Sequence, residues 1–259
     1  MNIETDDRWQ FWIDRGGTFT DVVAKQPNGA LVTHKLLSEN PEHYDDAAVQ
    51  GIRDLLGLAA DETIPGGDVA AVKMGTTVAT NALLERKGER TLLVITKGFE
   101  DALRIGYQAR PRLFDQRIVL PEQLYDRVVE VEERIGAHGE VHQDLDIEAA
   151  RVNLQAAYDD GYRSAAIVFM HAYRYPAHER AVADVAREIG FDQVSTGFET
   201  SPLMKLVGRG DTTVVDAYLS PILRRYVNRV AAELGDANLM FMQSNGGLVD
   251  ASLFQGKDA

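Results

Sequence analysis

IDRGGTFTD, residues Ile13–Asp21, joins two extended runs near the start of the chain, Trp9–Ile13 before it and Thr20–Ala24 after it. Its paired glycines, Gly16 and Gly17, let backbone N–H groups approach an anion with no side chain in the way. The stretch therefore predicts a strand, a tight turn that can bind phosphate, and a second strand.

The polar side chains of this stretch suit phosphate chemistry. Asp14, at the end of the first strand, is our candidate catalytic and metal-binding residue, because a carboxylate there can hold Mg²⁺ directly or through water. Asp21 is a second candidate catalytic residue that closes the turn and can orient a water or a threonine. The candidate nucleotide-binding residues are Arg15, Gly16, Gly17, Thr18 and Thr20.

An ordinary hairpin accounts for the same residue types, since Gly-Gly with Thr and Asp is good turn chemistry. From composition alone the two interpretations are equally supported. The position favours phosphate binding, because a strand-turn-strand at the start of a meander is where sugar kinases, chaperones and actin-like proteins hold the phosphates of ATP. The stretch matches neither the Gly-x-Gly-x-x-Gly pattern of a Rossmann fold nor a P-loop.

The sequence after this stretch first completes a meander and then alternates helices with strands. A Pro27-Asn28-Gly29 turn and Leu31–Leu37 predict a third antiparallel strand. Apolar residues at helical spacing predict a helix that ends at Gly57, and Pro221 should kink or split the last long helix. Further strands are expected at 69–74, 91–96, 125–134, 164–170, 194–195 and 239–242, and further helices at 78–87, 146–160, 177–189 and 213–234.

This order of elements predicts an α/β fold with a mixed sheet. We expect three parts: an α/β part with the phosphate motif over residues 1–97, an irregular inserted subdomain over 98–143, and a second α/β part over 144–259. The last six residues contain no finishing element, so we expect the chain to be the first part of a longer polypeptide.

Composition excludes several classes of protein. The net charge of −13 repels nucleic acid, so we expect no nucleic-acid partner. The chain has no cysteine, which removes disulfides, thiolate metal sites and a cysteine nucleophile. Met1–Arg8 is polar and acidic, unlike a signal peptide, and no apolar run approaches the ~18–20 residues that cross a bilayer. We therefore expect a cytoplasmic protein with no membrane partner.

A second polar motif, Gly75-Thr76-Thr77, follows a predicted strand and opens a predicted helix. Its N–H groups and hydroxyls could bind a carboxylate or phosphate. Capping of the helix by Thr76 or Thr77 is a strong alternative on chemistry alone. We take Gly75, Thr76, Thr77, Thr80 and Asn81 as candidate substrate-binding residues.

With Ile13–Asp21, the stretch Met74–Arg86 resembles the signatures of the hydantoinase A/5-oxoprolinase family. Further matches are Lys97-Gly98-Phe99, Glu130–Arg134, His171-Ala172-Tyr173 and Met242–Gly247. The resemblance spans nearly the whole chain. It implies an actin-like ATPase lobe with a ribonuclease-H-like mixed sheet and an inserted subdomain. It also implies that the chain ends before a second ATPase lobe.

Within this family the 5-oxoprolinase branch is favoured, because Arg15, Lys35–Pro41, Gly51-Ile52-Arg53 and Arg209–Thr213 are similar to it, whereas many members have an aliphatic residue or glycine at position 15. The resemblance implies ATP and Mg²⁺ as cofactors and the hydrolysis of 5-oxo-L-proline to L-glutamate, within glutathione metabolism. An N-methylhydantoinase and an acetone-carboxylase-type subunit are alternatives within the family. Outside it, the alternatives are a non-enzymatic actin-like ATPase, which lacks the Gly75–Asn81 block, and a sugar or acetate kinase, which shares the phosphate loop alone.

The resemblance also implies partners. They are a small cyclic amide, the rest of the same polypeptide with the second ATPase lobe, and a hydantoinase B-like subunit or domain. The full-length protein is expected to form a homo-oligomer, and the 259-residue chain alone is expected to be inactive. Of the histidines, His171 is the best candidate for a site, although a half-buried structural histidine is the more favoured interpretation.

Overall fold

The computed structural model of the chain describes residues 7–59, 62–108, 112 and 114–259. The chain forms two compact units, unit 1 from Met1–Glu85 with Ile222–Ala259 and unit 2 from Arg86–Pro221. No helix within the described residues is both long and apolar enough to cross a membrane.

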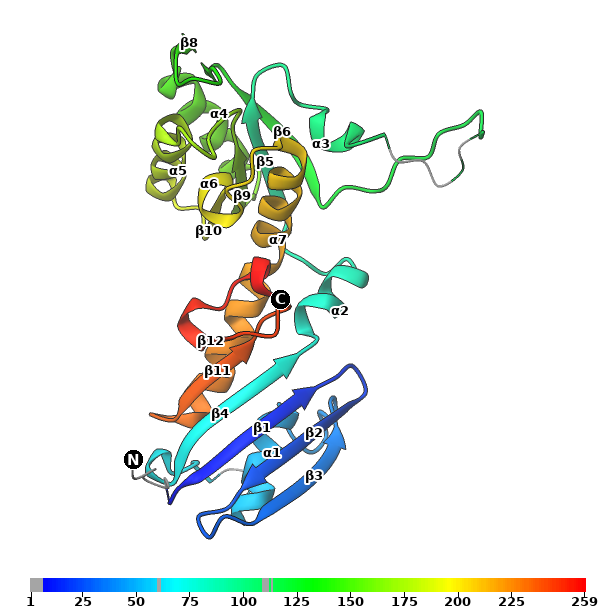
Figure 1. Cartoon of the computed structure of the whole chain (residues 1–259), viewed down its shortest axis with the longest axis vertical. Helices are drawn as coiled ribbons and strands as arrows, with labels where there is room; N and C mark the ends of the chain where they lie inside the picture. The colour runs from blue at the N-terminus through cyan, green and yellow to red at the C-terminus, as the bar shows by residue number, and fades with distance from the viewer. Residues whose placement is uncertain (1–6, 60–61, 109–111, 113) are drawn as a thin grey trace. The chain divides into compact units, whose positions relative to one another are not determined.

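Unit 1 is built on a six-stranded mixed sheet in the order β12-β11-β4-β1-β2-β3 (Figure 1). The predicted meander is confirmed, since β2 pairs antiparallel with β1 and β3, while β4 joins β1 in parallel. Its elements are β1 (Trp9–Arg15), β2 (Phe19–Lys25), β3 (Leu31–Leu37), α1 (Ala47–Leu56), η1 (Gly66–Asp68), β4 (Val69–Thr76), α2 (Val78–Leu84), β11 (Asn238–Met242), β12 (Leu248–Asp250), η2 (Ala251–Leu253) and η3 (Gly256–Asp258).

Alternation along these strands gives the sheet of unit 1 two different faces. Thr20, Val22 and Ala24 of β2 are buried, whereas the residues between them are exposed. The buried face packs against α1, whose first turn is capped by Asp46 accepting from the N–H groups of Ala48 and Val49. A strand that alternates in this way has one face on a core and the other open.

Unit 2 contains a four-stranded parallel sheet in the order β10-β9-β5-β6. Every residue of β5 and β9 is buried, as their continuous apolar sequences predict for strands covered on both faces. Its elements are β5 (Thr91–Thr96), α3 (Ala102–Ile105), β6 (Tyr125–Val131), β7 (Arg134–Ile135), β8 (Val141–Gln143), α4 (Ile147–Asp159), β9 (Ser164–Val168), α5 (Ala177–Ile189), β10 (Gln193–Thr196) and α6 (Gly197–Thr200).

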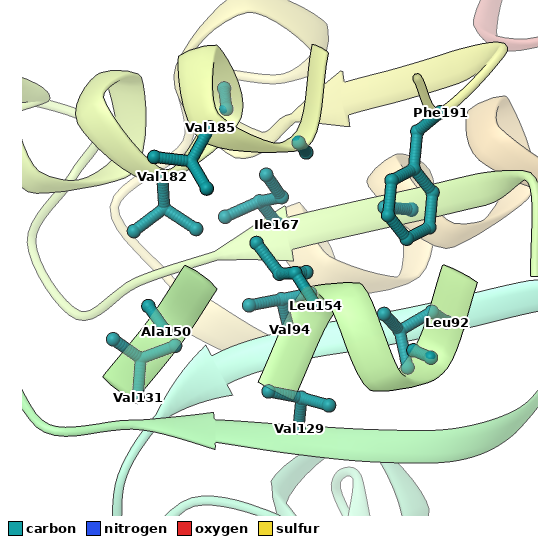
Figure 2. Close-up of a cluster of buried hydrophobic side chains, with 14 of the residues drawn as sticks. Leu92, Val94, Val129, Val131, Ala150, Leu154, Ile167, Val182, Val185 and Phe191 are labelled. Atoms are coloured by element: carbon teal, nitrogen blue, oxygen red, sulfur yellow. The ribbon is translucent and has the colours of Figure 1, made fainter. Parts of the chain in front are cut away.

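Two apolar clusters cover this sheet. The larger one joins the strands to α4 and α5, and Figure 2 shows Leu154, Val182 and Val185 pointing toward Val94 and Ile167 of the strands. The smaller cluster lies on the other face and includes Leu93, Ile95 and Val214. Because buried apolar side chains cover both faces of the sheet, unit 2 has a hydrophobic core of its own.

These units do not match the predicted division at residues 97 and 143. β5, expected in the first part, forms its hydrogen bonds with β6 and β9. For the same reason the stretch 98–143 is no separate body, since its main strand β6 lies in the sheet of unit 2. The predicted division differs from the observed units because strands pair between residues that are distant in the sequence, and such pairing cannot be read from a local sequence pattern.

The last long helix, α7 (Leu206–Leu234), begins earlier than expected and continues through Pro221, which does not split it. Its first turns contain two glycines, which are poor helix formers. They are held by Arg209, a fully buried arginine whose guanidinium donates to the carbonyls of Leu203, Met204 and Phe169. Tertiary hydrogen bonds thus override local propensity at this helix start.

Glu179 of unit 2 makes stability depend on pH. The carboxyl is buried, and burial raises its pKa to about 8, although it accepts a hydrogen bond from the Gly197 N–H. Between its ordinary pKa of 4.5 and about 8, the unfolded chain has lost this proton while the folded chain keeps it. The folded state then binds more protons than the unfolded state, so the free energy of unfolding should fall as pH rises through this window. The fall is roughly 1.4 kcal/mol for each unit by which folding raises the pKa of this carboxyl.

We predict that Glu179→Gln removes this fall, because glutamine has no proton to lose. Urea unfolding of the two chains at several values between pH 5 and pH 8.5 measures it, with Glu188→Gln as an exposed control on the same helix. Parallel stability curves for wild type and Glu179→Gln would contradict the assignment.

Candidate functional site

The predicted phosphate motif lies at the turn between β1 and β2. Asp14 and Asp21 are direct partners across the two strands, and Asp14 is also the register partner of Gly75 on β4. Gly16 donates its N–H to the Phe19 carbonyl at 3.1 Å, which closes the turn. A side chain at Gly16 would bring its Cβ to 3.0 Å from that carbonyl oxygen, so a glycine is needed for this tight approach.

The open face of the sheet forms a hollow of about 430 Å³ beside these residues. Asp14, Asp21 and Gly75 line it together, so the structure brings both candidate catalytic residues and part of the second motif to one place. A Cβ at position 75 would lie 3.5 Å from Asp14 Oδ1 and 3.2 Å from Met242 Cε. Glycine therefore keeps the space beside the Asp14 carboxylate open.

The two carboxylates differ in their surroundings. Asp21 accepts two hydrogen bonds from Lys35 Nζ, at 2.7 and 2.9 Å, whereas Asp14 makes no ion pair with any described residue. Within the described part of the chain, no group of three or more metal-ligating side chains occurs. Mg²⁺ needs no such group, because it is commonly held by one or two carboxylates with substrate phosphates and water. The exposed, unpaired Asp14 carboxylate fits that mode of binding.

Thr20 points to the opposite side of the sheet from Asp21 and is fully buried. Ser38 Oγ donates to the Gly16 carbonyl at 2.7 Å, so the 3.0 Å contact between Ser38 and Thr20 is donated by Thr20 Oγ1. These bonds tie the start of β2 and the end of β3 to the turn. Thr20 therefore has a structural role in the turn, and its contact with nucleotide stays a prediction.

Arg15 also faces the buried side. Its Nε lies 3.8 Å from Asp46 Oδ2, and its guanidinium lies 5.3 Å from the ring centroid of Tyr226 on α7. Burial raises the pKa of the Tyr226 hydroxyl well above its usual range, so this phenol stays neutral. Arg15 thus connects the end of β1 to the capped start of α1, and its predicted contact with nucleotide is likewise untested.

Gly17 and Thr18, in contrast, lie at the exposed tip of the turn, where backbone and hydroxyl donors are accessible to a ligand. The second motif lies against the same turn. Thr77 donates twice to the Arg15 carbonyl, from its backbone N–H at 3.1 Å and from Oγ1 at 3.2 Å. Asn81 Nδ2 then donates to Thr77 Oγ1 at 3.4 Å and lies 3.5 Å from where a Cβ on Gly17 would be. The two motifs therefore form one continuous polar surface.

The remaining residues of the second motif have separate places. Thr76 Oγ1 accepts from the Val78 N–H at 3.3 Å just before α2, whereas Thr77, the N-cap residue of this helix, makes no side-chain capping hydrogen bond. Thr80 is exposed on α2. Whether any of these five residues binds substrate stays a prediction.

Lys73 is a residue of this site that motif analysis missed. It lines the hollow with Asp14, and its Nζ lies 5.2 Å from the ring centroid of Trp12. Lys73 is two residues before Gly75 on β4, so the period of a strand could have placed it on the same face. Ser38 gave no such signal, because its role depends on the pairing of β2 with β3.

Comparisons with known proteins agree with the predicted resemblance. The sequence profile described as the hydantoinase/oxoprolinase N-terminal region matches residues 10–190, and the hydantoinase/oxoprolinase profile matches residues 209–259. 5-Oxoprolinase 1 of Arabidopsis thaliana is 42% identical over 291 residues, which cover 100% of this chain and 23% of that protein. The chain therefore spans less than a quarter of the length of this relative.

Two solved structures have a similar fold. An ATP-dependent caprolactamase from Pseudomonas jessenii has a TM-score of 0.79 at 30% identity, over 95% of this chain and 37% of that one. An acetone carboxylase in its nucleotide-free form has a TM-score of 0.76 at 20% identity, over 96% of this chain and 37% of that one. The predicted fold class, α/β with a mixed sheet of the actin-like ATPase type, is confirmed.

We predict that Thr20→Val and Thr18→Val have different effects on stability. Thr20→Val removes the buried donor to Ser38 and should cost about 1 kcal/mol or more of the free energy of unfolding. Thr18→Val changes an exposed side chain and should stay within about 0.5 kcal/mol of wild type. Urea unfolding of the nucleotide-free chain measures both, and equal effects of the two substitutions would refute the structural role of Thr20.

Proposed function

This chain belongs to the hydantoinase/oxoprolinase family, and we propose that it is the N-terminal part of an ATP-dependent enzyme that hydrolyses cyclic amides, with 5-oxo-L-proline as the substrate. The observation that carries the proposal is the unpaired Asp14 carboxylate, which lies between the glycine turn and Gly75 at the edge of an open hollow. The high identity to a 5-oxoprolinase over the whole chain supports the choice of substrate.

The proposed reaction overcomes the poor reactivity of an amide. Transfer of the terminal phosphoryl group of ATP to the lactam oxygen gives a leaving group, and addition of water then opens the ring to give glutamate, ADP and phosphate. Bound Mg²⁺ would neutralise charge on the phosphate oxygens. In this chain Asp14 would hold that ion, and the exposed N–H groups of Gly17 and Thr18 would donate to phosphate oxygens.

The second motif would complete the same surface. Since Thr77 uses its own N–H and hydroxyl on the Arg15 carbonyl, the groups that remain for a ligand are the Asn81 amide and the Thr80 hydroxyl. Gly75 contributes space beside Asp14. This division assigns phosphate to the first motif and the lactam to the second.

Further parts of the polypeptide belong to the proposal. The open face of unit 1 exposes Trp12, Phe19, Leu31, Leu37 and Met242, each by 37% or more, which suits a surface covered in the complete protein. We include a second ATPase lobe in the same polypeptide and a hydantoinase B-like part as its partners. We also propose a cytoplasmic location, and a role in glutathione metabolism that depends on the proposed 5-oxoprolinase activity.

The substrate is tested with the full-length polypeptide. Phosphate release from Mg-ATP should be stimulated by 5-oxo-L-proline, and less by hydantoin, N-methylhydantoin or caprolactam. Stimulation by a hydantoin or caprolactam alone would assign the enzyme to another activity of the family.

We predict that Asp14→Asn lowers the turnover of ATP by the full-length enzyme by at least ~100-fold, as expected for loss of a metal-positioning carboxylate. Asp236→Asn, an exposed control in unit 1, should leave the rate unchanged. Both variants should unfold at the wild-type temperature. Near-normal turnover in Asp14→Asn would exclude Asp14 from the site.

We also predict that the 259-residue chain by itself is folded but has no ATPase activity. A single lobe offers only part of the phosphate contacts and cannot exclude water by closure. Isothermal titration with Mg-ATP and a phosphate-release assay on the purified chain measure this. Micromolar affinity with steady turnover would show that the chain contains a complete site.

A further inference from the structure

The hollow on the open face of unit 1 has one basic side chain among its described lining residues, that of Lys73 on β4. Its Nζ lies 5.2 Å from the ring centroid of Trp12, and its ammonium group forms no hydrogen bond or ion pair with a described residue. Two other cationic side chains near the phosphate turn are engaged elsewhere, because Lys35 is bonded to Asp21 and Arg15 faces the buried side of the sheet. Lys73 is therefore the cation that the hollow offers to an anionic ligand.

The strand register sets the distance of Lys73 from the phosphate turn. Lys73 is the partner of Trp12 on β1, and Gly75 is the partner of Asp14, two residues closer to the turn. Two residues of a strand span about 7 Å. Asp14 thus lies between Lys73 on one side and the turn at Gly17 on the other. This order suits a ligand that has a phosphoryl group near the turn and a second anionic group on the Lys73 side.

The rest of the hollow is mainly apolar. Its walls include Trp12, Val23, Met242 and Leu248, whose side chains are between 37% and 51% exposed. Gly75 leaves open space among them, since a Cβ at this position would lie 3.2 Å from Met242 Cε. Apolar walls with one cation suit a small organic ring that carries a single negative charge.

We propose that Lys73 binds the carboxylate of the lactam substrate and makes the enzyme selective for lactams that have one. This role rests on the proposed function, in which the substrate, 5-oxo-L-proline, has a carboxylate on the carbon next to its ring nitrogen. The lactam oxygen would face Asp14 and the phosphoryl donor, while the ring methylenes would lie against the apolar walls and the carboxylate would pair with Nζ. The flexible stem of a lysine lets its ammonium group leave the Trp12 ring for this contact.

The position of Lys73 favours a substrate carboxylate over a phosphate of the nucleotide. The donors that we assign to phosphate, the N–H groups of Gly17 and Thr18, lie on the far side of Asp14 from Lys73. A polyphosphate also needs several donors around it, whereas Lys73 is surrounded by apolar walls. Covering of this face by another part of the polypeptide would exclude water from the hollow and strengthen the ion pair with the carboxylate.

The test compares wild type with Lys73→Met and Lys73→Arg in the full-length polypeptide, with phosphate release from Mg-ATP as the readout. Lys73→Met should raise the KM for 5-oxo-L-proline at least ~10-fold, as for loss of a charge-assisted hydrogen bond, while the KM for Mg-ATP stays within about twofold. It should also lower, by a similar factor, the preference for 5-oxo-L-proline over 2-pyrrolidinone, which is the same ring without the carboxylate. Lys73→Arg keeps the charge and should restore most of the affinity.

Lys25 provides a matched control, because it is also a half-buried lysine on the open face of unit 1 but does not line the hollow. Lys25→Met should leave both KM values within about twofold of wild type. A wild-type enzyme that 5-oxo-L-proline does not stimulate would overturn the proposed function and the role of Lys73 with it. In a wild type that is stimulated, an unchanged KM for 5-oxo-L-proline in Lys73→Met, or an equal rise in the KM for Mg-ATP, would overturn the role of Lys73 alone.

Discussion

The carbonyl of Arg15 is the point on which the arrangement of the candidate site depends. It accepts both the N–H and the hydroxyl of Thr77, a residue that is far away in the sequence and directly follows β4. The parallel pairing of β1 with β4 makes this contact possible, because it places Asp14 beside Gly75 and Arg15 beside Thr76. One pair of hydrogen bonds thereby joins two motifs that each resemble ordinary turn or cap chemistry when considered alone.

The two units differ in how their sheets are covered, and this difference separates a structural body from a binding surface. In unit 2 both faces of the parallel sheet are packed, with Leu92 and Val94 on one side and Leu93 and Ile95 on the other. In unit 1 only the face with Phe11 and Ile13 is buried. The opposite face keeps Asp14 accessible to solvent, at the cost of leaving apolar side chains such as Trp12 exposed. A site that closes on a ligand or on another lobe needs an accessible surface, and an open, partly charged sheet face provides one.

Much of this fold could be predicted from sequence, because local patterns decide it. β5 and α5 have the bounds expected from a buried apolar run and from helical spacing, and the meander followed from its turns. The division into units could not be predicted, since it depends on β5 pairing with β6 and β9 across long stretches of chain. The early start of α7 was missed for a related reason, because the burial of Arg209 is a tertiary effect.

The motifs of the site could be predicted from the sequence, but which of their side chains face the open side of the sheet could not. Asp14 and Asp21 were predicted as catalytic residues and Gly75 as a substrate-binding residue, and the three line one hollow. Arg15 and Thr20 belong to the same motif, yet the alternation of a strand turns them to the buried side. Their residue types suit phosphate binding, but in the structure Arg15 lies beside Asp46 and Thr20 bonds to Ser38. These contacts depend on the tertiary structure and could not be predicted from the motif.

We propose that the turn at Gly16–Thr18 and the motif at Gly75–Asn81 form one ligand surface. The most direct measurement is an amide-resolved NMR titration of the isotope-labelled chain with a non-hydrolysable Mg-ATP analogue, which also detects weak binding. We expect the N–H resonances of Gly17 and Thr18 to shift together with those around Thr77 and Asn81, and Asp14→Asn to abolish both sets of shifts. Shifts confined to unit 2, or shifts of one motif without the other, would contradict it.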